Sequence, residues 1–513
     1  MSEATWLNWL LWLPVLGMVA VGLVPKGRDS LVRSVTFGCM VLQLVLATLL
    51  YTRFNNMESG LQFATDVPWI ASWGVAYRVG LDGINVLLVA LTAFLGPLVV
   101  MGAWTAVQKD VKLFHAMVLF IQFAMLGTFL AQDLFLFYVF WEAMLIPMFL
   151  IIGLWGGERR IYATLKFVLY TAFGSILMLA ALIYLVLATH GSLGYMSFDF
   201  RHLYGSQLPL ATQVWLLSAF ALSFAIKVPM FPLHTWLPDA HVEAPTTGSV
   251  ILAGVLLKMG TYGFMKLGFP LFPDAARAMM PVIMVLAVIS IVYGACLALV
   301  QTDIKKIIAY SSISHLGYVM LGLASLDLIG IQGAILQMVS HGLVAGGLFL
   351  MVGMIYERTH SRAVADYGGL ARMLPVFSVF FTLLTLASIG LPTTSGFAGE
   401  FMVLLGAFNA AWPAHLAGNQ VPLTLAVIAV SGVILGALYM LWLAQRILFG
   451  EARAPHAPLK DLNARETTIL VAIVAAIFVI GLFPGEPLAK TELAAREFQS
   501  RVQGEPVQLG STR

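Results

Sequence analysis

The chain has 513 residues, of which 60% are hydrophobic and only 10% charged, and its mean hydropathy is +0.91. This composition excludes an ordinary soluble domain and indicates a polytopic membrane protein. The net charge of +3 is too small over this length to favour nucleic-acid binding. Cys39 and Cys296 are the two cysteines, and both lie in apolar runs. We therefore expect buried, inert thiols and neither an iron–sulfur cluster nor a structural zinc site.

Fourteen apolar runs are each long enough, at about 20 residues, to cross a bilayer. They lie near residues 6–24, 31–51, 82–105, 113–131, 133–155, 163–188, 211–230, 246–268, 278–300, 306–323, 329–355, 376–409, 422–445 and 467–484. The first run is followed by charged residues instead of a small-residue cleavage site, so we expect a retained helix. Aromatic and β-branched residues with polar breaks separate the second and third runs, which predicts a surface hairpin.

The lysines and arginines between the runs predict the orientation of the chain. Most of them follow runs 1, 3, 5, 9, 11 and 13, and Arg453 is among these. The opposite loops and the C-terminal tail, which ends in Arg513, carry fewer. The positive-inside rule therefore places the first set of loops in the cytoplasm and both termini on the outer side, in a bacterial inner membrane.

The stretch from residue 225 to residue 258 interrupts the apolar pattern most strongly. Lys227 and Lys258 bracket a polar centre that also holds four prolines, Pro229, Pro232, Pro238 and Pro245. Each proline removes a backbone hydrogen bond, and such backbone is tolerated at membrane depth only where protein or water covers it. The stretch therefore predicts a broken seventh helix, a polar crossing and the start of the eighth helix, with two lysines facing an internal pathway.

A second interruption falls in the twelfth run, where Gly390, Pro392 and Gly396 precede Glu400. Two interrupted segments at corresponding positions are typical of transporters built from inverted repeats. We expect an all-α fold with about 14 transmembrane helices, in which helices 4–8 (112–268) and 9–13 (278–447) form two inverted five-helix repeats. Residues 1–111 then hold helices 1–3 and the outer hairpin, and residues 448–513 hold helix 14 and an outer tail.

Glu142 lies in the middle of an apolar run, where an ionised carboxylate costs several kcal/mol unless it is paired. Lys227 belongs to the same half and is the natural partner. A fixed ion pair that only positions helices is one reading of these two residues. The alternative is a coupled pair, in which a movement or protonation of Glu142 changes the proton affinity of Lys227.

Lys258 has no carboxylate beside it in the sequence, which suits a proton carrier, although a lysine that reaches to the interface is the alternative. His315 and His341 lie on the tenth and eleventh runs among serines that could hold water. A structural histidine is the competing reading for both. Glu400 follows the second break and completes a set of ionisable groups that could carry protons through the bilayer centre. For Asp133, Asp239 and Asp303, which stand at the edges of runs, we expect interfacial solvation.

No phosphate-binding glycine loop occurs in the sequence, so neither ATP nor NADH is expected to bind this chain. The driving energy must then come from an ion gradient or from a partner protein.

Four segments resemble one known family. They are FWEAMLIP, KVPMFPLHTWLPDAHVEAPT, SSISHLGYVMLG and GLPTTSGFAGEF, and the similarity spans about residues 80–450. They are similar to the antiporter-like membrane subunits of complex I, the proton-pumping NADH:quinone oxidoreductase, and of multisubunit sodium/proton antiporters. The sequence most resembles the M-type branch, called subunit 4 in mitochondria, because Glu400 occupies a position where the other branches usually have lysine.

The resemblance implies roles for the matching residues. Glu142 and Lys227 would be the pair that modulates proton affinity, and Lys258 the central lysine of helix 8. His315 and His341 would be relay residues and Glu400 the outlet group. It further implies that FMN, the iron–sulfur clusters, and the NADH and quinone sites lie in partner subunits. L-type and N-type chains would then flank this one in a respiratory chain that couples electron transport to ATP synthesis.

Three other functions remain open from the sequence. A sodium/proton antiporter subunit would act without a redox partner, and a subunit of a membrane-bound hydrogenase would differ chiefly in the attached enzyme. A purely structural scaffold fits poorly with so many buried charges.

Overall fold

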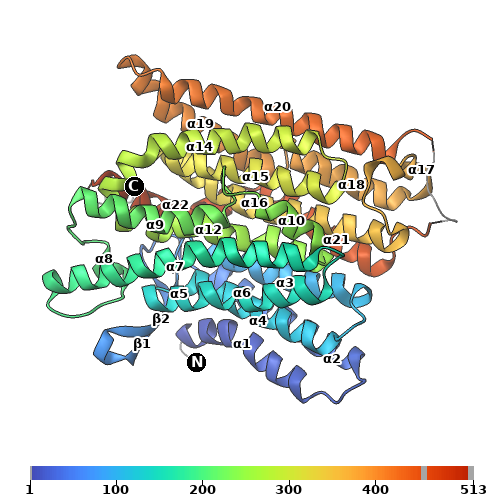
Figure 1. Ribbon diagram of the computed structural model, residues 1–513, viewed down its shortest axis with the longest axis horizontal. Coiled ribbons are helices and arrows are strands. Elements are labelled where there is room, and N and C mark those ends of the chain that lie inside the picture. The colour runs from blue at the N-terminus through green and yellow to red at the C-terminus, as the bar shows by residue number, and fades with distance from the viewer. Residues whose placement is uncertain (1–2, 452–458, 506–513) are drawn as a thin grey trace.

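The computed structural model describes residues 3–451 and 459–505. Arg453 and Arg513, which entered the orientation prediction, lie outside the described residues. In the described part, thirteen helical segments are long and apolar enough to cross a membrane. A broken helix fills the place of the predicted twelfth crossing, and Figure 1 shows the helices running roughly side by side. The predicted all-α polytopic fold is therefore confirmed.

The first three crossings are α1 (Glu3–Leu23), α2 (Asp29–Arg53) and α3 (Val86–Ala106). The next five are α4 (Val111–Leu130), α5 with α6 (Leu134–Ala143, Leu145–Trp155), α7 (Arg160–Leu193), α9 with α10 (Leu210–Lys227, Trp236–Glu243), and the run from α11 (Thr246–Ile251) through η2 (Leu252–Leu256), α12 (Leu257–Gly263) and η3 (Phe264–Gly268) to α13 (Phe269–Leu271). The short α8 (Phe200–Leu203) joins α7 to α9.

The remaining crossings are α14 (Pro273–Leu299), α15 (Ile304–Ala324), α16 (Leu328–Thr359), α18 with α19 (Pro375–Ser388, Ser395–Leu416), α20 (Val421–Leu448) and α21 (Ala464–Leu482). A single turn, α17 (Leu370–Met373), precedes α18, and α22 (Gly485–Gln503) ends the described chain. Figure 1 places the two chain ends on the same side of the bundle as the hairpin.

The predicted hairpin forms between the second and third crossings. Its strands are β1 (Gln62–Ile70) and β2 (Val75–Leu81), which pair antiparallel from Gln62 opposite Leu81 to Ile70 opposite Val75. Arg78 on β2 contacts Asp66 on β1 at 2.8 Å and lies 3.4 Å from Asp199, next to α8. The hairpin is thus joined to the loop that follows α7.

Three crossings are interrupted, two of them as predicted. Residues 228–235 separate α9 from α10, and residues 389–394 separate α18 from α19. Gly390 lies in the second break with a φ of 72°, a conformation that favours glycine. The third break, between α5 and α6 at Met144, was not predicted. Pro147 explains it, because proline cannot donate to the carbonyl four residues before it and clashes with that group.

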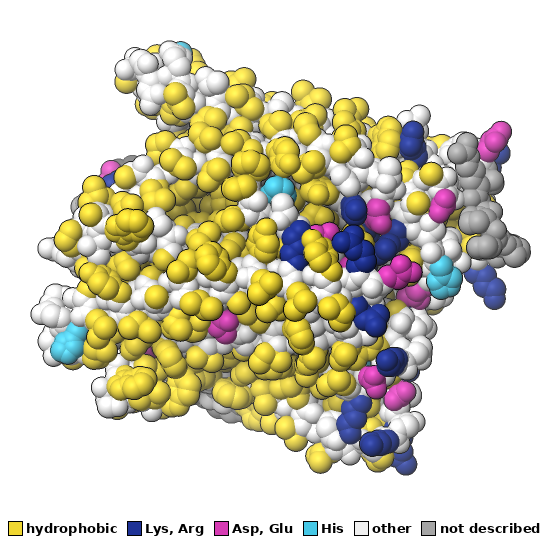
Figure 2. All heavy atoms as spheres, viewed as in Figure 1, with side chains coloured by type: hydrophobic (Ala, Val, Ile, Leu, Met, Phe, Trp, Pro, Cys, Tyr) yellow, Lys and Arg dark blue, Asp and Glu magenta, His cyan; other side chains and the backbone are white. Residues whose placement is uncertain are grey.

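The centre of the bundle is formed by the crossing that contains α12, together with α15 and α16. Almost all residues in the apolar parts of these three crossings are buried. By contrast, α20 and the first two crossings expose most of theirs, and Figure 2 shows hydrophobic side chains over the lateral face of the molecule. The site residues on the central helices are therefore shielded from lipid on all sides.

Two expectations about single residues were wrong. Asp133 is fully buried instead of solvated at the interface, because its carboxylate caps α5 and also accepts from the backbone N–H of Ala76 at 3.1 Å. Cys296 is exposed on α14 instead of buried, whereas Cys39 is buried as expected. Asp239 and Asp303 are partly exposed, and they pair with Lys166 at 2.7 Å and with Arg362 at 3.5 Å.

The C-terminal tail also differs from the expectation, because it contains the amphipathic helix α22. Its buried residues follow a helical period and pack toward α13, α14 and α16; they are Pro487, Lys490, Thr491, Ala495, Phe498 and Val502. This spacing of three and four residues is readable in the sequence. The segment carries many charges, so a search for long apolar runs does not find this helix.

We predict that Gly260→Ala destabilises the protein. A Cβ at Gly260 would lie 2.7 Å from the Phe224 carbonyl oxygen and 2.8 Å from the Val228 backbone nitrogen, so α12 and α9 would have to separate. The expected cost is about 1–3 kcal/mol, as for other overpacked cores. The control is Gly22→Ala on α1, where a Cβ meets no atom within 4 Å. Thermal unfolding of the purified protein in detergent measures both, and equal midpoints would contradict the prediction.

Candidate functional site: a buried chain of ionisable residues

Lys258 occupies the middle of the bundle on the short α12. Two π-helical segments, η2 and η3, flank α12, and such segments are frequent at functional sites because they re-aim side chains. Lys258 is fully buried. Its ammonium contacts the carbonyl oxygen of Ala253 in η2, and Nζ lies 2.6 Å from Nδ1 of His341 on α16. The alternative of a lysine that reaches to the interface is therefore wrong.

His341 continues the chain toward the second broken helix. Its ring lies 5.7 Å, between centroids, from the ring of His315 on α15. Nδ1 of His315 lies 2.6 Å from Oε1 of Glu400 on α19. The structure thus brings together four of the six predicted residues, in the spatial order Lys258, His341, His315 and Glu400. This spatial order differs from the order along the chain, in which His315 precedes His341.

A small cavity accompanies this chain between α15, α16 and α19. It is lined by both histidines, Glu400 and several polar groups, among them Ser311, Ser340 and Gln337. Its volume of about 10 Å³ is close to the space that one water molecule requires. Gln337 donates its amide to Oε1 of Glu400 at 2.8 Å, and the free Nε2 atoms of both histidines have no protein partner. A water in this cavity could bridge the two rings, which do not touch through their nitrogen atoms.

Glu142 and Lys227 form a second, separate group. Their charges act on each other, yet they form no ion pair within 4 Å in the described part of the chain. Lys227 instead places Nζ 3.3 Å from Sδ of Met144 and 4.8 Å from the centre of the Trp141 ring. Oε1 of Glu142 is buried without a hydrogen-bond partner. This arrangement does not fit a fixed ion pair.

Sequence reasoning missed two buried cations and one histidine. Lys305 had been placed in a loop but is buried, with Nζ donating to the Ala244 carbonyl oxygen at 2.9 Å. His241 on α10 is fully buried, stacks on Phe349 at 4.5 Å and experiences the charges of Lys305 and Lys258. Lys266, also assigned to a loop, is buried in η3 and pairs with Asp82. His241 was detectable, because it falls inside the proline-interrupted stretch.

The described residues contain no group of three or more His, Cys, Asp and Glu side chains that could hold a metal ion. The lysine, histidine and glutamate side chains of the two groups just described can bind and release protons.

Comparison with known proteins identifies the family. The sequence model described as "NADH:quinone oxidoreductase/Mrp antiporter, TM" matches residues 131–423, which is more than half of the chain. The chain belongs to this family. The matched region contains every one of the six predicted site residues, from Glu142 to Glu400.

Relatives within the family place the chain in the M-type branch. It is 43% identical over 520 residues to NADH-quinone oxidoreductase subunit M of Rhodobacter capsulatus, with 98% of each chain covered. A chain in the structure of respiratory complex I from Thermus thermophilus with bound NADH matches with a TM-score of 0.86 and 33% identity, covering 97% of this chain and 99% of that one. A chain of the Mrp complex from Dietzia sp. DQ12-45-1b has a TM-score of 0.82 but 20% identity, so that likeness shows the fold alone. The predicted resemblance is confirmed.

We predict that Lys258→Met leaves the stability of the protein unchanged or raises it. Methionine has a similar volume, and replacing a buried charge by a well-packed apolar group is often neutral or stabilising. Leu257→Ala, at the neighbouring fully buried position, should instead cost about 2–5 kcal/mol. Thermal midpoints of the two purified variants test this. A lower midpoint for Lys258→Met would mean that the lysine is structural.

Proposed function

We propose that this chain is a proton-translocating membrane subunit of an NADH:quinone oxidoreductase and that protons move along Lys258, His341, His315 and Glu400. The observation that carries this proposal is that the four side chains follow one another through the bundle. Lys258 lies 2.6 Å from His341 at one end, and His315 lies 2.6 Å from Glu400 at the other. Buried ionisable groups are costly in a membrane, and they are retained where they carry charge.

The separation of Glu142 and Lys227 suggests how the chain is driven. When the two approach, the carboxylate favours the charged form of the lysine, and when they part, burial favours the neutral form. A change of one pKa unit corresponds to about 1.4 kcal/mol. Moving one charge against 100 mV costs about 2.3 kcal/mol, so a shift of a few units has the required size.

The two predicted inverted repeats offer a reason for the placement of these groups. Helices 5 and 7 carry Glu142 and Lys227, and the corresponding helices 10 and 12 carry His315 and Glu400. In both halves the break falls in the fourth helix of five, at residues 228–235 and 389–394. On these corresponding helices each half would then hold one acid and one base. In the second half these are in direct contact, and in the first half they are apart.

In this proposal the energy comes from partner subunits that hold FMN and the iron–sulfur clusters. L-type and N-type chains would flank it in the membrane arm. Through such neighbours a change of charge or hydration could reach Glu142, which is partly exposed on the lateral surface.

We predict that Glu142→Ala, Lys227→Ala and Lys258→Met each lower proton pumping and NADH-driven quinone reduction together, by about tenfold or more, because each removes a group whose pKa must change. NADH–ferricyanide reduction, which reports the assembled peripheral arm, should not change. The exposed residues Glu158 and Lys26 provide the controls Glu158→Ala and Lys26→Ala. If quinone reduction is untouched and only sodium or pH tolerance changes, the chain is an antiporter subunit.

The proposed orientation places both termini and the hairpin on the outer side of a bacterial inner membrane. Figure 2 shows lysine and arginine side chains gathered at the end of the molecule opposite the hairpin, as the positive-inside rule requires of the cytoplasmic end.

We predict that a membrane-impermeant maleimide labels Ser59→Cys, in the hairpin loop, from outside intact cells. Glu158→Cys, between α6 and α7, should react only after the membrane is opened. Both positions are exposed. The background for labelling is the Cys296→Ser variant, because Cys296 is exposed on α14. The reverse pattern would invert the orientation.

A further inference from the structure

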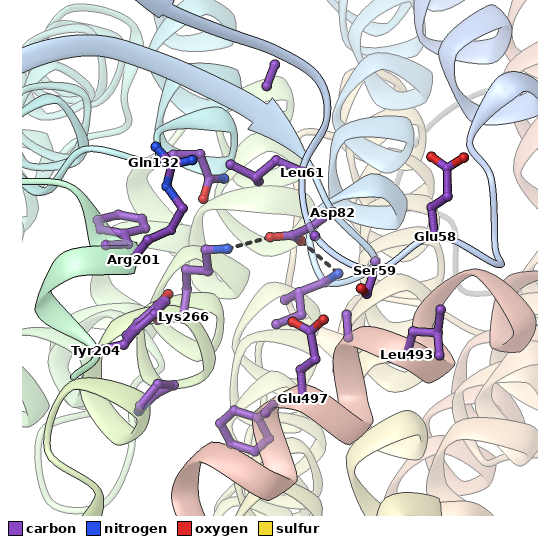
Figure 3. Close-up of a pocket in the computed structure, with 18 of the residues that line it drawn as sticks. Glu58, Ser59, Leu61, Asp82, Gln132, Arg201, Tyr204, Lys266, Leu493 and Glu497 are labelled. Carbon is purple, nitrogen blue, oxygen red and sulfur yellow. Dashed lines mark hydrogen bonds and ion pairs between the residues drawn. The ribbon is translucent and has the colours of Figure 1, made fainter. Parts of the chain in front are cut away.

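The buried lysines of this protein differ in what holds their charge. In the described part of the chain five lysines are buried, and in four of them the ammonium contacts an oxygen atom; these are Lys258, Lys266, Lys305 and Lys490. Figure 3 shows Lys266 pointing toward the Asp82 carboxylate at the wall of a cavity of about 380 Å³. The fifth is Lys227, and no oxygen or nitrogen acceptor among the described residues lies within hydrogen-bonding distance of its ammonium.

Two side chains from the fifth crossing hold Lys227 instead. Its Nζ lies 3.3 Å from the sulfur of Met144 and 4.8 Å from the centre of the Trp141 ring. Both of these residues are buried. A thioether sulfur is a weak acceptor, and the face of a tryptophan ring attracts a cation most strongly where water is excluded. These contacts therefore stabilise the ammonium without neutralising its charge.

The geometry of the helix sends Glu142 in another direction. Trp141 and Met144 are three residues apart and share one side of the helix, whereas consecutive residues project about 100° apart. Glu142 lies between them in the sequence, and its carboxylate interacts with the hydroxyl of Ser175 on α7. The acid and Lys227 are thus held by different neighbours, although Glu142 is directly bonded in sequence to one of the residues that hold the lysine.

We propose that Trp141 and Met144 are positioning residues that receive the Lys227 ammonium when it parts from Glu142. The inference rests on the proposed function, in which the two charges approach and separate. Without this site, separation would leave a buried ammonium with no partner, and the lysine would stay at the carboxylate. A ring face and a thioether hold an ammonium less strongly than a carboxylate does, so Lys227 can still lose its proton there.

The first test locates Lys227 without measuring activity. A membrane-permeant carbodiimide activates a carboxyl group, and an amine in contact with it then forms an amide, while the carbodiimide takes up the elements of water and leaves as a urea. In native membranes, the yield of the Glu142–Lys227 amide should rise about threefold or more in Trp141→Leu, as expected for the loss of one cation–π contact. It should rise by a smaller factor in Met144→Leu. Peptide mass spectrometry measures the yield, and wild-type yields in both variants would overturn the inference.

The second test measures proton pumping and NADH-driven quinone reduction in the same membranes. Trp141→Leu should lower both, and Trp141→Phe, which keeps an aromatic face, should recover most of the loss. Met144→Leu nearly conserves the side-chain volume, so it decides the question if Trp141→Leu does not assemble. NADH–ferricyanide reduction reports assembly. The controls are Phe140→Leu and Met148→Leu, at buried positions on the neighbouring turns, and they should keep the wild-type amide yield and pumping.

The outcomes separate this inference from the proposed function. If Trp141→Phe is as impaired as Trp141→Leu, or if the two controls reproduce the effects, Trp141 and Met144 act only through packing and the inference is wrong. If Lys227→Ala itself leaves pumping intact, the proposed function fails. If Lys227→Ala abolishes pumping while the Trp141 and Met144 variants pump normally, the inference alone fails.

Discussion

The arrangement of this protein depends on Lys258, a buried lysine at the centre of the bundle that lacks a carboxylate partner. Lys258 is fully buried, contacts a histidine ring and a backbone carbonyl, and forms no ion pair in the described part of the chain. A charge in such surroundings is costly unless neighbouring groups compensate it. Lys258 lies on one of the three most buried crossings, so lipid and bulk water do not screen its charge.

Interrupted helices supply polar backbone groups beside the buried ionisable residues. A continuous membrane helix satisfies all its backbone groups internally and leaves no donor or acceptor for a mobile proton. In this chain the breaks at 228–235 and 389–394 lie beside Lys227 and just before Glu400, and a third break adjoins Glu142. The π-helical segments on either side of α12 likewise place irregular backbone near Lys258. Irregular backbone therefore adjoins four of the proposed proton-binding residues, which are Glu142, Lys227, Lys258 and Glu400.

The two predicted halves differ in the distance between the acid and the base on their corresponding helices. Glu142 and Lys227 are apart, whereas His315 and Glu400 are in contact. In the proposed function the pair that is apart would respond to an external field, and the pair in contact would pass on a proton.

Apolar run length, proline positions and loop charge were enough to predict the number of crossings, the breaks in helices 7 and 12, the hairpin and the six candidate residues. These features are local, because a helix must satisfy its own backbone and a buried charge is visible in its own apolar run. The tertiary structure alone decided that His341, and not His315, contacts Lys258, and that Glu142 and Lys227 stay apart. It also buried Lys266, Lys305 and Asp133, which stand at the ends of apolar runs in the sequence. Contacts between helices depend on rotation and tilt, and the approach of residues 83 positions apart, such as Lys258 and His341, leaves no mark on the segments between them.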